Sequence, residues 1–222
     1  DEFLGRHYVD CFGGADAATE HFTPIQKAIN YAMTSLLTTG GIRGNKRAVS
    51  KFEPRSFNMG LSRRAFQATG GFGRIHPGED PDLTLRLWQK GFETAFVEEA
   101  FVYHKRRISW EKYYLQVKKF GQTRAILNQW HPQSRKIVHW FPTLFLIGFL
   151  SSLLLLFVGE WGFIFIYIAY FILIFFDSKR INHSSQIGYL SVWAVCLQFY
   201  AYGTGFLGAT LRILSSKKSP EE

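Results

Sequence analysis

The stretch GEDPDLTLRLWQKGF, residues 78–92, places three carboxylates close together and then turns apolar. Asp80 is a good helix N-cap, and Pro81 is a good first helical residue. Asp82 can pair with Arg86 one turn later, and Gly91 is a suitable stop. The local pattern therefore predicts a short helix that begins at Asp80 and ends just before Gly91.

The same acids have a second interpretation, which concerns chemistry. The glycine-rich segment GGFGRIHPGE, residues 70–79, delivers Glu79 and Asp80 at the mouth of this helix. A carboxylate beside a loop can contact a substrate and accept a proton from an attacking hydroxyl. A metal-binding D-x-D is not expected, because Pro81 starts a helix and Asp80 and Asp82 would point to different sides. Local physics leaves the structural and the catalytic interpretations open.

Three apolar segments without charge lie in the second half of the chain, at residues 141–158, 161–176 and 187–211. A membrane-spanning helix needs roughly 20 apolar residues, so the first and third qualify and the second is short. The segments are consecutive and lack a polar face, which disfavours the alternative of a buried core in a soluble protein. We expect a membrane protein with two to three spans.

The excess of positive charge is concentrated before the first apolar segment. Residues 101–136 hold nine Lys or Arg side chains, and Glu111 is the only acid among them. This asymmetry favours a cytoplasmic location for the part of the chain before the first apolar segment, and contact of its basic residues with anionic lipids. We expect residues 109–139 to form basic amphipathic helices on the membrane surface, with aromatic residues such as Tyr113 at head-group depth. An ordinary pair of surface helices is the alternative.

The end of the chain is harder to place. Three full spans would put the basic residues 212–218 outside, which the charge rule disfavours. Either the last segment does not cross fully or its charges are tolerated. Three glycines, Gly203, Gly205 and Gly208, permit a broken path.

The first half of the chain shows weaker local patterns. We expect a loop over residues 1–20, one helix over residues 24–39, a short strand in 57–62 and a helix stopped by Gly70. Residues 94–97 and 100–104 suit short strands. The two cysteines, Cys11 and Cys196, indicate neither a disulfide framework nor a zinc site. The sequence starts at Asp1 without a Met, so we treat it as a piece of a longer protein.

Several motifs occur in order and at close spacing: FNMGLSRRAFQATGGF, GEDPDLTLRLWQKGF, AFVYHKRR and QVKKFGQTR. Together they resemble the C-terminal half of a family 2 glycosyltransferase of the GT-A fold, over roughly residues 10–130. The resemblance implies an α/β fold class. It divides the chain into residues 1–108, the C-terminal half of the catalytic domain, 109–139, the interfacial helices, 140–213, the membrane helices, and 214–222, a polar tail.

The resemblance also implies roles for single residues. Asp80 matches the catalytic base, and Glu79 would help to hold the site. Asn58 and Gly60 match a glycine loop that approaches donor and acceptor, where small residues let the backbone come close. His104 matches a histidine on the metal or diphosphate, although a lone histidine is more often an ordinary surface or core residue.

Four further residues complete the expected substrate-binding set. Arg106 and Arg107 could bind the donor diphosphate, and membrane-facing charge is an equal alternative for them. Gln116 and Arg124 resemble a pattern that caps the site. Processive synthases carry Q-x-x-R-W, whereas this chain has QVKKF at residues 116–120, which favours transfer of a single sugar.

The expected function is a membrane-bound inverting glycosyltransferase of hexosyl type in cell-surface glycan or polysaccharide synthesis. It would use a nucleotide-sugar donor and a glycan or lipid-linked acceptor, with membrane lipids and no nucleic acid as partners. Mg²⁺ or Mn²⁺ would be bound mainly by an N-terminal half that precedes Asp1, so this piece alone would be inactive. The expected location is the inner (plasma) membrane, multi-pass, with the catalytic part cytoplasmic.

Two other classes of function compete with this one. The chain could be a membrane-anchored scaffold or binding module derived from such an enzyme, although Glu79, Asp80 and Gly60 are intact. A transporter is disfavoured, because the spans contain no charge and intramembrane charges usually mark transport paths.

Overall fold

The computed structural model describes residues 5, 8–17, 21–40, 51–103 and 107–216. The chain divides into two compact units. The first unit comprises Asp1–Phe22 and Met33–Lys105, and the second comprises Thr23–Ala32 and Arg106–Glu222. Helices predominate, and each unit is described by itself.

A small mixed sheet forms the centre of the first unit. Strand β1 (Cys11–Gly13) pairs antiparallel with β3 (Met59–Leu61) and parallel with β4 (Thr94–Phe96), in the order β3-β1-β4. Strands β2 (Asp16–Ala17) and β5 (Val102–Tyr103) form a second, parallel pair. The expected strands near residues 60, 95 and 102 are confirmed. The expected loop over residues 1–20 was wrong, because β1 and β2 lie there and are too short to show an alternating pattern.

Two helices follow β3 and pack against the sheet. Helix α4 (Arg63–Thr69) begins after Ser62, whose side chain accepts a hydrogen bond from the Ala65 N–H, and ends at Gly70. Helix α5 comprises Glu79–Gln89. The core between these elements contains the buried side chains of Cys11, Ala65, Leu83 and Leu87. Asp82 and the start of α5 are thereby placed on a packed scaffold.

Asp10 ties the start of β1 to helix α4, which the sequence alone did not indicate. Its carboxylate accepts hydrogen bonds from Ser62 Oγ at 2.7 Å and from Arg64 Nη2 at 2.7 Å. The hydrogen bond from Arg64 is the main reason why the pKa of Asp10 is lowered, and burial opposes it. Asp10 is therefore a structural acid.

The expected single helix over residues 24–39 is two helices. Helix α2 (Pro24–Thr34) ends before Ser35, and Ser35 caps α3 (Leu36–Thr39) by accepting from the Leu37 N–H. Most of α2 belongs to the second unit, where the Tyr31 hydroxyl donates to Asp177 Oδ2 at 2.8 Å.

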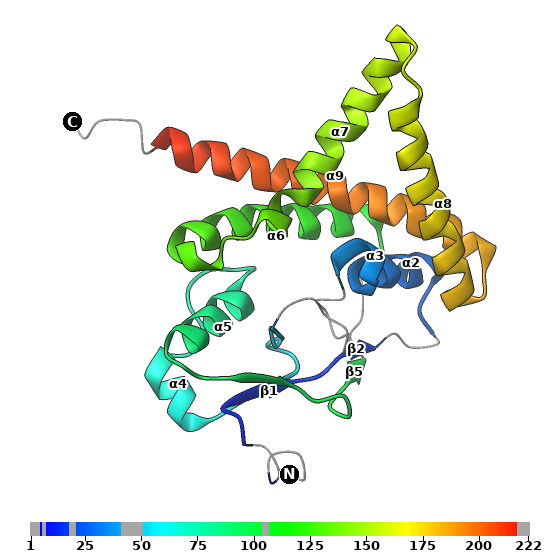
Figure 1. Cartoon of the computed structure of the whole chain (residues 1–222). Coiled ribbons are helices and arrows are strands. Elements are labelled where there is room, and N and C mark those ends of the chain that lie inside the picture. Colours follow the sequence, from blue (N-terminus) through cyan, green and yellow to red (C-terminus); the bar gives the residue numbers. More distant parts are fainter. Residues whose placement is uncertain (1–4, 6–7, 18–20, 41–50, 104–106, 217–222) are drawn as a thin grey trace. The chain divides into compact units, whose positions relative to one another are not determined.

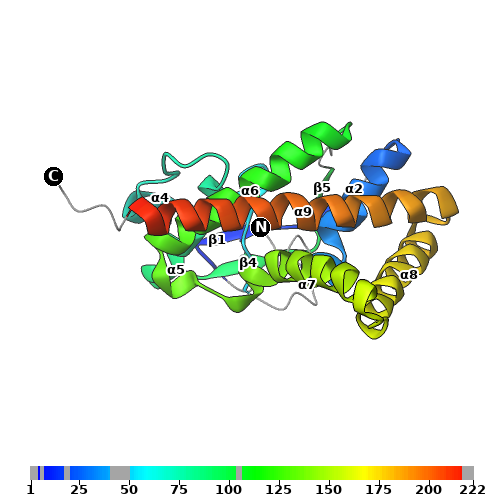
Figure 2. The same cartoon turned by 90° about the horizontal axis from the view of Figure 1, so that it is seen from above.

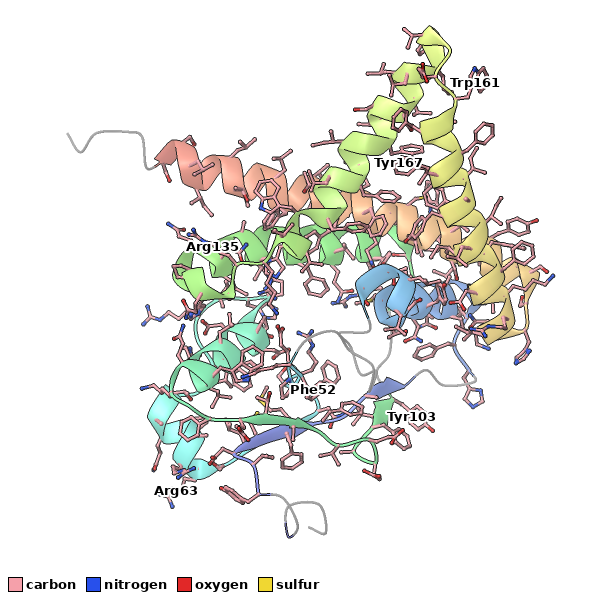
Figure 3. The ribbon with its side chains drawn as sticks, viewed as in Figure 1. Phe52, Arg63, Tyr103, Arg135, Trp161 and Tyr167 are labelled. Carbon is pink, nitrogen blue, oxygen red and sulfur yellow. The ribbon has the colours of Figure 1, made fainter. Side chains whose placement is uncertain are left out.

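The second unit consists of helices, three of them long. From Trp110 onward its elements are α6 (Trp110–Trp130), the short turns η1 (Pro132–Ser134) and η2 (Ile137–Trp140), α7 (Phe141–Leu155), the short turn η3 (Leu156–Val158), α8 (Gly162–Asn182) and α9 (Ser185–Ser216). Helices α7 and α8 form a hairpin with Trp161 at its tip (Figures 1 and 3). Tyr167 of α8 packs on Phe145 of α7, with ring centroids 4.9 Å apart.

Helices α6 and α9 pack closely against each other, and Figure 2 shows them crossing at an angle. Glycine permits this approach from both sides. A Cβ on Gly121 would meet the carbonyl oxygen of Tyr202, and a Cβ on Gly205 would meet the carbonyl oxygen of Lys118. Helix α9 runs without a break through its glycines, so these residues serve packing and do not interrupt the helix.

Tyr113 on α6 does not lie at the surface as we expected. Its side chain is fully buried, and its hydroxyl donates to Gln198 Oε1 on α9 at 2.7 Å. A buried phenol needs such a partner, and the partner comes from 85 residues further along the chain.

Three helices are long and apolar enough to cross a membrane: Ile137–Val158, Gly162–Asn182 and Ser185–Ser216. The second is longer than the apolar segment that predicted it, because α8 continues through the polar residues after Phe176. This supports a membrane protein with three candidate spans.

Candidate active site

Asp80 lies at the start of helix α5, close to the position that the sequence indicated. The helix begins one residue earlier than expected, at Glu79, and Gly78 is its N-cap without a side-chain hydrogen bond. The prediction that Asp80 is the N-cap was therefore wrong. Pro81 is accommodated because the first N–H groups of a helix have no intrahelical acceptor. Asp80 consequently sits in the first turn, where the helix dipole favours a negative charge.

The Asp80 carboxylate is half-buried, and its surroundings have opposing effects on its pKa. Its Oδ1 accepts a hydrogen bond from the Ser56 backbone N–H at 3.1 Å. The pKa of Asp80 is raised, chiefly by burial, with a smaller contribution from Glu79, while Arg55 and the side chain and backbone N–H of Ser56 oppose the shift. A carboxyl group with a raised pKa is a better proton acceptor than an ordinary surface aspartate.

Arg55 is a neighbour of this carboxylate that sequence reasoning missed. It lies in the basic segment before β3, where the residues show no periodicity that would distinguish it from Arg47 or Lys51. Its charge acts on Asp80, and its Nε is buried without a hydrogen-bond acceptor among the described residues.

Glu79 uses its carboxylate on the loop that precedes it. Glu79 Oε2 accepts from the Gly78 N–H at 2.9 Å and lies 3.1 Å from His76 Nδ1. These contacts fix the end of the glycine-rich segment next to Asp80. A role of Glu79 in holding a substrate site stays a prediction.

Asp82 is a structural acid, as the spacing predicted. Its buried carboxylate accepts from Arg86 Nε at 3.0 Å and from Nη2 at 2.7 Å. Arg86 also donates to the carbonyl oxygens of Thr69 at 2.6 Å and Gly71 at 2.8 Å. Because Arg86 contacts both Asp82 on α5 and the carbonyl oxygens at the end of α4, it joins the two helices. A cation at the C-terminus of α4 is also favoured by the helix dipole.

Asn58 and Gly60 both have structural tasks in the first unit. Asn58 Nδ2 donates to the carbonyl oxygen of Ala100 at 2.6 Å. Gly60 lies in strand β3 rather than in a loop, opposite Phe12, and a Cβ there would collide with the Phe12 ring. Any contact of these residues with substrate stays a prediction.

The remaining predicted residues fall outside this group. His104 and Arg106 lie outside the described residues. Arg107 is exposed, and Gln116 and Arg124 are half-buried on helix α6; all three belong to the second unit. The structure thus brings Asp80, Glu79 and Ser56 together in the first unit.

A divalent metal has no ready site in the described part of the chain. There, no three His, Cys, Asp or Glu side chains are grouped to hold one. These residues therefore do not fit a metal ion by themselves, and we assign no step of the chemistry to one.

Comparison with known families identifies this chain. The family described as Glycosyl transferase family group 2 matches residues 57–178, more than half of the chain. The match begins just before β3 and ends in α8, so it includes Asp80 and the first candidate span. Comparison with curated proteins and with solved structures found no match. The chain belongs to glycosyl transferase family group 2.

Proposed function

We propose that this chain is part of a membrane-bound inverting glycosyltransferase with a GT-A catalytic domain. It moves one sugar from a nucleotide-diphosphate donor to a membrane-associated glycan or lipid-linked acceptor. The observation that carries the proposal is Asp80, a half-buried carboxylate with a raised pKa at the start of α5, within the matched region.

The main task of Asp80 is to accept the proton of the acceptor hydroxyl. The acceptor hydroxyl oxygen attacks the anomeric carbon as its proton passes to an Asp80 oxygen. The bond from that carbon to the diphosphate oxygen breaks, and the nucleoside diphosphate leaves with the electron pair. Attack from the face opposite the leaving group inverts the configuration. Asn58 and Gly60, in the same unit as Asp80, are the described residues that we propose for approaching the substrate.

The proposal has three further parts that follow the family. Nucleotide-sugar binding is supplied chiefly by residues of the N-terminal half of the catalytic domain, and the C-terminal half alone is inactive. Mg²⁺ or Mn²⁺ is held chiefly by those residues. The catalytic part faces the cytoplasm at the inner (plasma) membrane, which is supported by the basic residues next to the first candidate span.

A donor screen with the full-length protein in membranes tests the proposal. Radiolabelled UDP-glucose, UDP-galactose, UDP-N-acetylglucosamine and GDP-mannose are supplied with and without chelator, and product is measured for wild type and Asp80→Asn. We expect Asp80→Asn to lower transfer by roughly 10²–10⁴-fold, the usual contribution of a general base. Glu93→Gln, which neutralises an exposed acid of the same unit, is the matched control and should transfer at the wild-type rate.

Each arm has an outcome that contradicts part of the proposal. Transfer by Asp80→Asn near the wild-type rate would show that another group is the base. Full activity in chelator would remove the metal from the proposal. Transfer from no donor by the wild type would favour a non-catalytic binding module.

A further inference from the structure

Arg55 stands out among the cations of the first unit because the next residue, Ser56, donates its backbone N–H to the proposed base. Among the described residues no acceptor binds its buried Nε, and no described carboxylate forms an ion pair with it. Buried guanidinium nitrogens are normally hydrogen-bonded, so an arginine placed in this way needs an explanation. The other described arginine–carboxylate pairs of this unit, Arg64 with Asp10 and Arg86 with Asp82, show direct ion pairs.

The chain before Arg55 is anchored to strand β4 and helix α5. The Thr94 hydroxyl donates to the carbonyl oxygen of Phe52 at 2.7 Å, and it accepts from Trp88 Nε1 at 3.1 Å. The rings of Phe52 and Phe96 are 5.1 Å apart in an edge-on contact, and Figure 3 labels Phe52. The backbone that leads into Arg55 therefore has a fixed place on the scaffold.

The chain after Arg55 is anchored as well. The Asn58 N–H donates to the Arg55 carbonyl oxygen at 2.7 Å and closes a turn over residues 55–58. The Asn58 side chain donates to the carbonyl oxygen of Ala100. The Ser56 N–H, inside the turn, donates to Oδ1 of Asp80. The turn thus gives the Asp80 carboxylate one hydrogen bond, and Arg55 precedes the donor of that bond in the chain.

Among the described residues, few other charges act on Asp80. On its own helix, Glu79 raises the pKa of Asp80, and His76 lies against Glu79. Asp82 is balanced by Arg86. Among the described residues, Arg55 is the cation that opposes the effect of burial on the Asp80 carboxylate.

We propose that Arg55 is a positioning residue of the transferase: the turn Arg55–Asn58, whose Ser56 N–H binds Asp80, keeps the Arg55 charge near that carboxylate, so that it is charged when an acceptor hydroxyl arrives. The proposal rests on the proposed function, because it assigns to Arg55 a task that acts through the base. It goes beyond that function by naming a residue outside the motifs that define the site.

The pH dependence of transfer tests this role in the full-length protein in membranes. The readout is kcat/KM against pH, with the radiolabelled nucleotide sugar that gives product in the donor screen. Without the cation, Asp80 should hold its proton to higher pH. We therefore expect Arg55→Met to move the acid limb upward and to lower kcat/KM at the acid end roughly tenfold, while the alkaline plateau changes much less. Arg55→Lys keeps the charge and should restore most of the wild-type profile.

Arg63→Met is the matched control, since Arg63 is an exposed arginine on α4 (Figure 3). Its profile should overlie the wild type. Arg55→Gln is a second neutral variant, to be used if Arg55→Met does not accumulate in membranes, and its acid limb should shift in the same direction.

The possible failures are distinguishable. An unchanged acid limb in Arg55→Met or Arg55→Gln, or an equal loss at every pH, overturns the proposal for Arg55 even when Asp80→Asn is inactive. A shift that Arg55→Lys does not reverse also overturns it. Activity in Asp80→Asn instead contradicts the proposed function.

Discussion

Replacing Arg86 by Met should loosen the scaffold that carries the candidate base. Arg86 donates two hydrogen bonds to the Asp82 carboxylate and two to the carbonyl oxygens at the end of α4. The Asp82 side chain is 5% exposed and that of Arg86 is 22% exposed, so water replaces little of what is lost. Breaking a buried pair by removing one partner costs about 3–5 kcal/mol.

Hydrogen exchange followed by mass spectrometry measures this cost locally, which suits a protein of two units for which a single unfolding free energy is poorly defined. At about 1.4 kcal/mol per factor of ten, amides of α4 and α5 should exchange between roughly 10²-fold and several thousand-fold faster in Arg86→Met than in the wild type. Arg63→Met, at the exposed start of α4, should leave exchange unchanged.

The double variant Asp82→Asn/Arg86→Met separates the pair from other effects. It removes the buried charge together with its partner, so it should exchange more slowly than Arg86→Met alone. Protection of α4 and α5 in Arg86→Met within about threefold of wild type would refute the assigned role of the pair, since such a change corresponds to less than about 1 kcal/mol.

Three further outcomes are expected. Gly205→Ala should lower the thermal stability of the detergent-solubilised protein, because its Cβ would press on the backbone of α6 at a cost of about 1–3 kcal/mol, whereas Gly208→Ala, with open space around it, should not. Tyr113→Phe should cost about 1–3 kcal/mol in the same assay, because Gln198 Oε1 loses its donor; a variant as stable as wild type would contradict this. Asp80→Asn should be more stable than wild type at neutral pH, with the gain lost in acid. Because burial raises the Asp80 pKa on folding, the folded state binds more protons, and the stability of the wild type falls as pH rises through that pKa. Unfolding curves of wild type and Asp80→Asn at neutral pH and in acid check the sign of this difference.

Local patterns in the sequence predicted much of the fold. Helix α5, the Asp82–Arg86 pair and the stop of α4 at Gly70 depend on residues within one or two turns, and all three are confirmed. The three candidate spans are visible as runs of apolar side chains. Short strands such as β1 were missed, because their pairing partners lie far along the chain and three residues cannot show a period.

The residues of the candidate site likewise divide into those predicted from local sequence motifs and those that were missed. Asp80 was predicted as the base from the motifs of residues 57–124, a role that stays a prediction. The cation near it was not predicted, because Arg55 reaches Asp80 only through the turn that Asn58 closes and through contacts to Ala100 and Thr94. Tyr113 was assigned to the surface for a similar reason, since its partner Gln198 lies on another helix. Sequence spacing carries no information about such tertiary partners.

The close contact between α6 and α9 has a consequence for how the protein responds to bilayer thickness. Helix α9 has 32 residues. At 1.5 Å per residue this is about 48 Å, whereas the hydrocarbon layer is about 30 Å thick. A helix of this length that crosses a bilayer has to tilt or extend beyond it, and the tilt depends on the lipid. Because the backbones of α6 and α9 meet at Gly121 and Gly205, α6 would have to follow such a tilt of α9.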